Sequence, residues 1–359
     1  MLKQLFKKQA SAMVGIDVGT HSIKAVLLSQ QDDGYQLDAF AIEAIPKGVL
    51  ADREVQDMEA LVRVVERIRK KLPKTVSHAI AAVSGSTVIT KVIYMDVNLS
   101  DEDLEGQIEI EADSLIPYPL NEVSLDFEKL DVNQMDPSKV NVLLSAARTE
   151  SIESLTECID DAGFETKVVD VESYALSRSS ELCLSQLPAE ERAGITALID
   201  IGASMTLFSV VENGENIYTR DQVFGGEQYT QSIMSYYNRG YDESERAKVG
   251  DDLPQNYVME VLMPFQTQLL QQIRRSVQMF LTTSGRENID NIIISGGSSL
   301  IAGIEQVLIE ELGIHTVLAN PFVDMKVAES VDKQSLEKVQ SQLMVASGLA
   351  LRSFSQWHI

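Results

Sequence analysis

One short motif occurs twice in this sequence, and the repeat limits the folds that the chain can adopt. The motif reads Gly-Ile-Asp-Val-Gly-Thr at residues 15–20 and Leu-Ile-Asp-Ile-Gly-Ala at residues 198–203. In each copy an apolar run ends in an aspartate, Asp17 or Asp200, and a second apolar run follows the glycine. This pattern predicts two strands joined by a tight glycine turn. Single copies are common, so the prediction rests on the matched pair, which indicates a chain with two similarly built halves.

Both turns carry the residue types that bind a nucleoside triphosphate. Glycine lets the backbone turn tightly enough to direct several N–H groups at one anion. A carboxylate beside phosphates holds Mg²⁺, usually through the water shell of the metal. Two such hairpins facing each other would clamp ATP between two domains, with Asp17 and Asp200 as the metal-holding residues. The alternative is that both aspartates only end strands and shape turns.

The charge balance argues against nucleic acid as a partner. The 359 residues include 54 acidic and 30 basic side chains, a formal net charge of −24. Such a surface repels phosphate backbones. A nucleotide site must therefore supply its own positive charge from backbone amides, a lysine and Mg²⁺.

Length and composition predict two soluble α/β domains. The chain is long enough for two cores, and its two cysteines, Cys158 and Cys183, are expected to be buried apolar residues rather than a framework. We recognise no signal peptide, and no run reaches the roughly 20 apolar residues that span a bilayer.

Strands and helices alternate along most of the chain, which is typical of an α/β architecture. We expect a first domain from residues 13–85 and 167–193, against which a C-terminal helix at 336–359 packs, and a second domain over 194–335. Residues 1–12 form a basic tail. This tail is either a frayed terminus or a helix for a membrane surface or a partner.

Residues 86–166 read as a compact α+β unit inserted into the first domain. We expect strands at 88–97, 123–130 and 139–147, and helices after Ser100 and over 150–162. Outside this unit the main helices are expected at 52–72, after Gly225-Gly226, over 255–283 with a kink at Pro264, and at 342–351.

Two further segments extend the candidate nucleotide site. Lys24 follows Asp17 by seven residues, on the strand that leaves the first turn. Taken alone it reads as a solvated strand residue, but behind the glycine turn it is placed to reach a β- or γ-phosphate. Gly296 and Gly297 follow a buried strand and allow close approach of an adenosine, and the helix expected next favours the α-phosphate.

Glu245 and Lys248 lie one helical turn apart in an acidic helical stretch. This spacing is equally typical of a surface ion pair. His21, beside the first turn, is read as a bystander rather than a base.

In this order, the motifs resemble the actin-like ATPase superfamily, which includes actin, the heat-shock chaperone ATPases and the division protein FtsA. The resemblance implies an α/β fold of the actin-like ATPase (ribonuclease H-like) type, with two domains around a nucleotide cleft. The unit at 86–166 corresponds to an FtsA-type inserted α+β subdomain, and about 228–287 to the adenine-side subdomain. Residues 168–176 and 342–351 look like the two connectors between the domains. ATP and Mg²⁺ are the implied cofactors.

The resemblance also implies the contacts of the nucleotide. Asp17 and Asp200 would hold the metal. The nucleotide-contacting residues come from five matching segments: Gly19, Thr20, His21, Ser22 and Lys24; Gly202, Ala203 and Ser204; Gly225 and Gly226; Glu245 and Lys248; Gly296, Gly297 and Ser298. Asp170 and Glu172, beside the first connector, are the candidates for orienting the attacking water. Since neither aligns without a shift of register, we expect slow turnover or none.

The inserted unit narrows the resemblance to the PilM family of type IV pilus assembly proteins. The segments that carry it are residues 108–112, 116–119, 123–126 and 169–176. It implies an ATP-binding cytoplasmic adaptor that a partner holds at the inner membrane. The implied partner is the cytoplasmic N-terminal peptide of a single-span inner-membrane pilus protein (PilN-like), with pilus motor or platform proteins as further candidates. Alternatives within the same fold are an FtsA-like filament-forming ATPase and a sugar or metabolite kinase.

A groove between the first domain and the inserted unit, close to Tyr118, is the expected site for this peptide. The unit contributes none of the residues expected at the nucleotide site, so it is available for binding a partner. The acidic chain suits a tail rich in Lys or Arg. The alternative is that the insertion serves stability alone.

Overall fold

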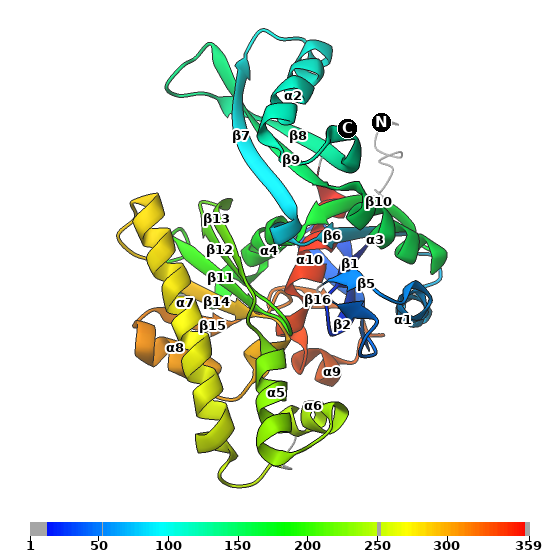
Figure 1. Cartoon of the computed structure of the whole chain (residues 1–359), viewed down its shortest axis with the longest axis vertical. Helices are drawn as coiled ribbons and strands as arrows, with labels where there is room; N and C mark the ends of the chain where they lie inside the picture. The colour runs from blue at the N-terminus through cyan, green and yellow to red at the C-terminus, as the bar shows by residue number, and fades with distance from the viewer. Residues whose placement is uncertain (1–12, 52, 250–252, 356–359) are drawn as a thin grey trace.

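Three units, each built on its own sheet, make up the computed structural model, which describes residues 13–51, 53–249 and 253–355. The two larger units lie side by side, and the smallest lies at one end of the long axis (Figure 1). The basic tail expected at residues 1–12 is outside the described residues. None of the described helices combines the length and the apolar character that crossing a membrane requires.

The first unit is a six-stranded sheet in the order β10-β6-β1-β2-β3-β16. Its strands are β1 (Val14–Val18), β2 (Ser22–Gln31), β3 (Gly34–Ala44), β6 (His78–Val83), β10 (Glu165–Val171) and β16 (Lys326–Val327). Helices α1 (Met58–Lys71) and α3 (Thr149–Asp161) cover one face and share a core with Ile16 and Ala81. The expected pairing of the first two strands is confirmed, since β1 and β2 form an antiparallel hairpin.

The second unit is a five-stranded sheet in the order β13-β12-β11-β14-β15. Its strands are β11 (Thr196–Ile201), β12 (Thr206–Glu212), β13 (Glu215–Gln222), β14 (Asn291–Ser295) and β15 (His315–Leu318). The helices that accompany it are α5 (Gly226–Tyr237), α6 (Tyr241–Val249), α7 (Met263–Ser284) and α8 (Ile304–Leu312). A π-helical turn at Val258–Leu262 runs directly into α7, and Pro264, where a kink was expected, lies at the N-terminal end of α7 just after this turn.

The third unit is a three-stranded sheet, β7-β9-β8, with one helix on it. Its elements are β7 (Val88–Asp96), α2 (Asp101–Leu115), β8 (Val123–Val132) and β9 (Lys139–Arg148). Helix α2 packs Leu104 and Ile108 against Val142, so this unit has a core of its own. As expected, Ser100 caps α2, because its hydroxyl accepts the amide of Asp103 at 3.2 Å.

Helix α3 packs differently from the expectation that placed it in the inserted unit. Its buried residues Cys158 and Ile159 belong to the core shared with α1 and the six-stranded sheet. On this packing we place the end of the inserted unit near Arg148 rather than at residue 166. Cys158 and Cys183 are both buried and free, as expected.

Three other elements differ from the sequence-based expectations. Helix α1 begins at Met58 rather than at 52, because the residues before it pair as a hairpin of β4 (Leu50–Ala51) and β5 (Glu54–Val55). After β14 the chain makes a 3₁₀ turn, and α8 begins only at Ile304. Residues 326–327, which the expected boundaries placed in the second domain, form strand β16 and pair with β3 of the first sheet.

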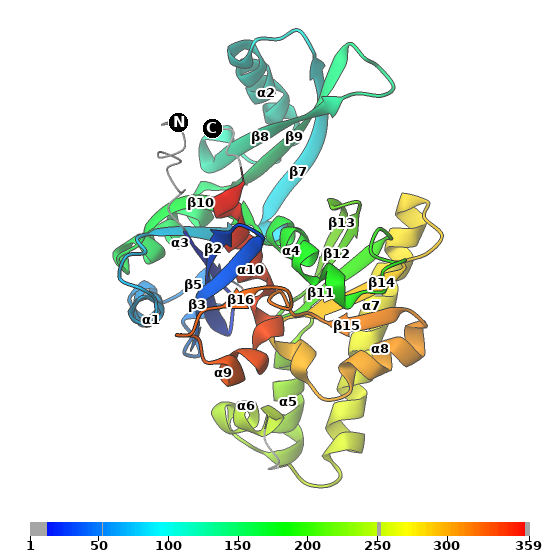
Figure 2. The same cartoon turned by 180° about the vertical axis from the view of Figure 1, so that it is seen from behind.

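Two helices connect the larger units: α4 (Glu172–Ser180) and α10 (Met344–Leu351), which follows α9 (Lys333–Glu337). Ala346 of α10 packs into the core of the first sheet, and Leu349 packs into the core beside the second. The view from behind shows α10 running through the centre of the molecule (Figure 2). At Gly348 the two connectors approach so closely that a Cβ would lie 1.8 Å from the carbonyl oxygen of Ala175.

Candidate functional site

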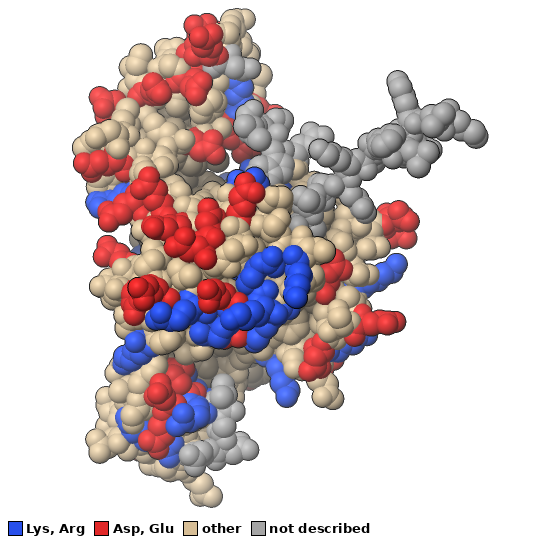
Figure 3. All heavy atoms as spheres, turned by 90° about the vertical axis from the view of Figure 1, so that its right-hand side faces the viewer, with Lys and Arg blue, Asp and Glu red and all other residues tan. Residues whose placement is uncertain are grey.

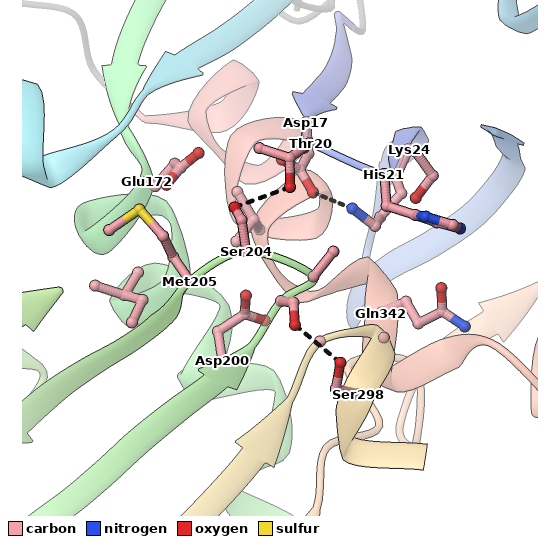
Figure 4. Close-up of a pocket in the computed structure, with 18 of the residues that line it drawn as sticks. Asp17, Thr20, His21, Lys24, Glu172, Asp200, Ser204, Met205, Ser298 and Gln342 are labelled. Carbon is pink, nitrogen blue, oxygen red and sulfur yellow. Dashed lines mark hydrogen bonds and ion pairs between the residues drawn. The ribbon is translucent and has the colours of Figure 1, made fainter. Parts of the chain in front are cut away.

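The two repeated hairpins face each other across the boundary between the larger units. In the first, Asp17 pairs in register with Lys24, and in the second Asp200 pairs with Leu207. Figure 4 shows Asp17 and Asp200 extending from these strands toward one cavity. The hydroxyl groups of Thr20 and Ser204 lie 3.0 Å apart and link the two turns directly. The sequence repeat is therefore a repeat in space, and the two halves enclose a cleft.

Most of the residues predicted to contact nucleotide or metal line this cleft, which has a volume of about 250 Å³. Those that line it are Asp17, Gly19, Thr20, His21, Ser22, Lys24, Glu172, Asp200, Gly202, Ala203, Ser204, Glu245, Lys248, Gly296, Gly297 and Ser298. Three others do not: Asp170, Gly225 and Gly226. Their roles in binding stay predictions, and the contacts below state what each side chain can do.

Lys24 supplies a positive charge inside the cleft. Its ammonium group lies 2.9 Å from a carboxylate oxygen of Asp17, and its side chain is only 13% exposed. Burial lowers the pKa of Lys24, but the charge and hydrogen bond of Asp17, with the charges of Asp200 and Glu172, outweigh it and leave the pKa raised. Lys24 therefore stays protonated at neutral pH and is not the solvated strand residue that its position alone suggests.

Asp200 is the more isolated of the two aspartates. It accepts the hydroxyl of Ser295 at 2.8 Å, and burial, together with the charge of Asp17, raises its pKa. A cation between the two carboxylates would relieve this cost. No group of three or more His, Cys, Asp or Glu side chains in the described part of the chain is arranged to hold a metal directly. Two facing carboxylates are residues that could hold Mg²⁺ through its water shell.

The segment expected on the adenine side reaches the cleft through α6. Glu245 and Lys248 form an ion pair of 2.7 Å, with side chains 18% and 14% exposed, so they are not a solvated surface pair. The hydroxyl of Thr230 on α5 also bonds Glu245. His21 lies 3.9 Å from the same carboxylate and joins the first turn to this helix.

The glycines expected to contact the nucleotide differ in their surroundings. Gly296 has φ of 85°, and a Cβ there would lie 2.5 Å from the carbonyl oxygen of Ile201, so this glycine allows the strands to pack. At Gly297 the nearest atom to a Cβ is 3.8 Å away, which leaves room toward the cavity. Gly225 and Gly226 lie behind the second turn, where the amide of Gly226 donates to Gly202 at 3.0 Å.

Of the two acidic residues beside the first connector, only Glu172 faces the cleft. Asp170 instead pairs with Arg178 at 3.0 Å, and Arg178 also donates to the carbonyl of Gly348 at 2.9 Å. This contact ties the two connectors together and leaves Asp170 outside the set of residues that line the cleft. The prediction of a water-orienting role for Asp170 is therefore not supported by its geometry.

Glu172 pairs with a residue that the sequence analysis missed. Nη1 of Arg53 donates to both carboxylate oxygens of Glu172, at 2.8 and 2.9 Å. Burial raises the pKa of Glu172 to about 7, and the negative charge of Asp17 adds to this rise. The positive charge of Arg53 acts in the opposite direction. Arg53 was hidden within the helix expected from residue 52, and nothing in its local pattern marks it.

This raised pKa predicts a pH dependence of stability. Between about pH 4.5 and 7 the folded protein keeps a proton on Glu172 that the unfolded chain has released, so stability falls as pH rises through this window. Between pH 4.5 and 8 the free energy of unfolding of the wild type should fall by about 2 kcal/mol more than that of Glu172→Gln. This figure is smaller than the full difference in pKa implies, because the carboxyl keeps some contact with water. Urea unfolding at several pH values measures the difference. Parallel curves for the two proteins would contradict the raised pKa.

Asp221 of β13 and Gln342 before α10 also line the cleft. Asp221 was not predicted, because it lies on a strand with no motif of its own. Gln342 is the first residue of the segment matched to the second connector, so the sequence did indicate its neighbourhood.

Comparison with known proteins identifies the family. A family model described as type IV pilus assembly protein PilM matches residues 15–354. The chain belongs to the PilM family. A solved structure described as the PilM-PilN type IV pilus biogenesis complex is 25% identical, with a TM-score of 0.81, and the match covers 96% of this chain and 99% of that one.

More distant relatives share the architecture. The cell division protein FtsA of Bacillus subtilis is 25% identical over 258 residues, which is 66% of this chain and 57% of that protein. The ethanolamine utilization protein EutJ from Carboxydothermus hydrogenoformans is 15% identical, with a TM-score of 0.58 over 94% of this chain and 89% of that one, a likeness of fold alone. The expected actin-like ATPase fold, related to PilM and FtsA, is confirmed.

Proposed function

We propose that the chain is an adaptor of type IV pilus assembly that binds ATP with Mg²⁺ in the cleft. The observation that carries the nucleotide part is the facing pair of hairpins, with Asp17, Lys24 and Asp200 gathered between them. In the proposed complex Lys24 neutralises a terminal phosphate, and the two aspartates accept hydrogen bonds from the waters of the metal. The metal supplies charge neutralisation of the phosphates.

Hydrolysis is proposed to be slow or absent. Glu172 is the one acidic candidate beside the first connector that reaches the cleft, and its carboxylate is occupied by Arg53. The carboxylate can accept further bonds, but a group that orients water must also be aimed at the water, and the two bonds to Arg53 fix where this carboxylate points. ATP then acts as a ligand that fixes the two units relative to each other.

The partner is proposed to occupy a second cavity. A groove of about 600 Å³ opens between the first unit and the inserted sheet, with walls from both. Tyr118, Ala146 and Ala147 line it from the inserted unit, and Leu155 of α3 lines it from the first unit. This is the region where we expect an extended peptide. The solved relative is a complex of PilM with PilN, and we assign the groove to the cytoplasmic N-terminal peptide of a PilN-like inner-membrane protein.

Charge near the groove suits a basic peptide. Glu54, Glu150 and Glu172 line it, together with two arginines: Arg53, which pairs with Glu172, and Arg148, which stacks over the ring of Tyr118. On the face shown in Figure 3, acidic side chains gather toward the inserted unit, above a band of Lys and Arg side chains. Complementary charge speeds encounter with a tail rich in Lys or Arg at modest ionic strength. Binding to such a tail would hold the protein at the inner membrane.

A single substitution in the groove tests this assignment. Ser151 is an exposed residue of α3 that lines the groove, so Ser151→Arg adds bulk and positive charge there with little effect on folding. We expect it to weaken binding of the synthetic PilN peptide of the same organism at least tenfold, about 1.4 kcal/mol, while ATP binding is retained.

Glu153→Arg is the control: it introduces the same side chain, and its change in charge, +2, is larger than the +1 of Ser151→Arg. Glu153 is exposed on the same helix but does not line the groove. Fluorescence anisotropy with labelled peptide measures both variants. Equal loss in the two would mean that overall charge, rather than the groove, governs binding, and retention of affinity by Ser151→Arg would place the peptide elsewhere.

A further inference from the structure

Two contacts join the first unit to helix α6 beside the nucleotide cleft. Nε2 of His21, in the first turn, lies 3.9 Å from a carboxylate oxygen of Glu245. Nζ of Lys47 lies 4.0 Å from the centre of the Tyr241 ring, a cation–π contact. Tyr241 and Glu245 are one helical turn apart on α6, which lies toward the end of the molecule opposite the inserted unit (Figure 1). We call these four residues the clasp.

Both sides of the clasp are fixed to the elements that carry them. On the first unit, the amide of Ile45 donates to the carbonyl of His21 at 2.8 Å, which holds the loop of Lys47 against the first turn. On the second unit, the hydroxyl of Tyr241 donates to Glu227 of α5 at 3.1 Å. A movement of α5 and α6 away from the first unit therefore pulls directly on the clasp.

The cleft is small for a nucleoside triphosphate. Its volume is about 250 Å³, below the roughly 300–1,000 Å³ that is typical of small-molecule sites. His21 and Glu245 both line it, and Figure 4 shows His21 and Lys24 on the same side of the cavity. Widening the cleft on this side moves α6 away from the first unit and breaks both contacts of the clasp.

The clasp is a weaker junction between the larger units than the connectors are. Helix α10 is buried along its whole length, and its Gly348 touches the backbone of α4, so separating the connectors would expose apolar surface. In the clasp, by contrast, Lys47 is exposed and His21 is 42% exposed, so water solvates both when their contacts break. Between the phosphate turns, Thr20 and Ser204 add one neutral hydrogen bond, which water can replace. The units are therefore expected to open at the clasp and to turn about the connectors.

We propose that the clasp is the gate of the nucleotide cleft, so that its opening sets the rates at which Mg²⁺–ATP enters and leaves. The clasp closes the cleft both before and after binding. Weakening it therefore lowers the barrier to entry and the barrier to exit alike, and the dissociation constant, which is the ratio of the two rates, changes little. Lys47 and Tyr241 carry this role without lining the cleft themselves. This inference rests on the proposed function, since it assumes a nucleotide in the cleft.

The test is a stopped-flow measurement of the association and dissociation of ATP labelled with a fluorescent methylanthraniloyl group, in the presence of Mg²⁺. In Lys47→Ala and in Tyr241→Leu we expect both rate constants to rise about threefold or more, with a dissociation constant within about twofold of the wild type. Lys47→Arg keeps a cation over the ring and should retain the wild-type rates. The double variant should be no faster than the faster single variant, because the two residues form one contact.

Arg69→Ala is the matched control. The Arg69 guanidinium also lies over an aromatic ring, 4.9 Å from the centre of Phe164, but both residues belong to the first unit. This variant should keep both wild-type rates. Wild-type rates in Lys47→Ala and Tyr241→Leu would overturn the gate while leaving ATP binding intact.

Faster dissociation with an equal loss of affinity would also overturn the gate, because a residue that contacts the bound nucleotide behaves in that way. Failure of the wild type to bind the labelled ATP or unlabelled ATP would instead overturn the proposed function, and the gate with it.

Discussion

Replacing Asp17 with alanine is expected to weaken Mg²⁺-dependent ATP binding a hundredfold or more, about 3 kcal/mol. The carboxylate is one of the two proposed acceptors for the waters of the metal, and it also positions the ammonium group of Lys24 at 2.9 Å. In the variant, Lys24 keeps its charge and still attracts phosphate. The loss should therefore fall on the gain in affinity that Mg²⁺ provides, while binding of metal-free ATP changes little.

Calorimetric titration of ATP in Mg²⁺ and in EDTA separates the affinity that Mg²⁺ adds from the affinity for metal-free ATP. Asp200→Ala should behave like Asp17→Ala, because both carboxylates face one cavity. Asp126→Ala is a suitable control, since Asp126 is an exposed residue of β8 in the inserted unit. Wild-type affinity for Mg²⁺–ATP in both cleft variants would remove the basis for assigning the metal to this pair.

Gly348→Ala is expected to lower the free energy of unfolding by about 4 kcal/mol, although alanine is the better helix former. The added methyl group would lie 1.8 Å from the carbonyl oxygen of Ala175 and 2.5 Å from its carbon, both backbone atoms of α4. Backbone atoms cannot move aside as a flexible side chain does, so the connectors must separate. The separation would also strain the bond from Arg178 to the Gly348 carbonyl.

Gly106→Ala is the matched control for this substitution. Gly106 also lies inside a helix, α2, but a Cβ there meets nothing within 4 Å. Without a clash, alanine should raise stability by about 0.5–1 kcal/mol through its helix propensity. Urea unfolding measures both variants. Similar stability of Gly348→Ala and the wild type would mean that the connectors are packed less closely than described.

The hairpins and their site were predictable because the relevant signal is local. An apolar run that ends in Asp and Gly determines a strand, its end and a turn within a few residues. The repeat of this pattern then implied that the turns of residues 15–20 and 198–203 share a cavity. Lys24 was found for the same reason, since the antiparallel register places it opposite Asp17.

Packing partners were less predictable. The apolar face of α3 shows that the helix is buried, but not that it lies beside α1 rather than on the inserted sheet. Arg53 was missed because a two-residue strand such as β5 carries too little pattern to distinguish it from the first turn of a helix. The positions of Asp170 and Glu172 depend on where β10 ends and α4 begins, because the alternation of sides along a strand stops at that junction.

We propose that one Mg²⁺–ATP binds between the two repeated hairpins and holds the larger units together. Thermal unfolding of the metal-free protein with ATP, with ATP and Mg²⁺, and with NAD and Mg²⁺ tests it most directly. A ligand that binds only the folded state adds about 2.7 kcal/mol at a hundredfold excess over its dissociation constant. We expect the unfolding temperature to rise by several degrees with ATP and Mg²⁺, to rise less with ATP alone and not to rise with NAD. An unfolding temperature that is the same in all three conditions would contradict it.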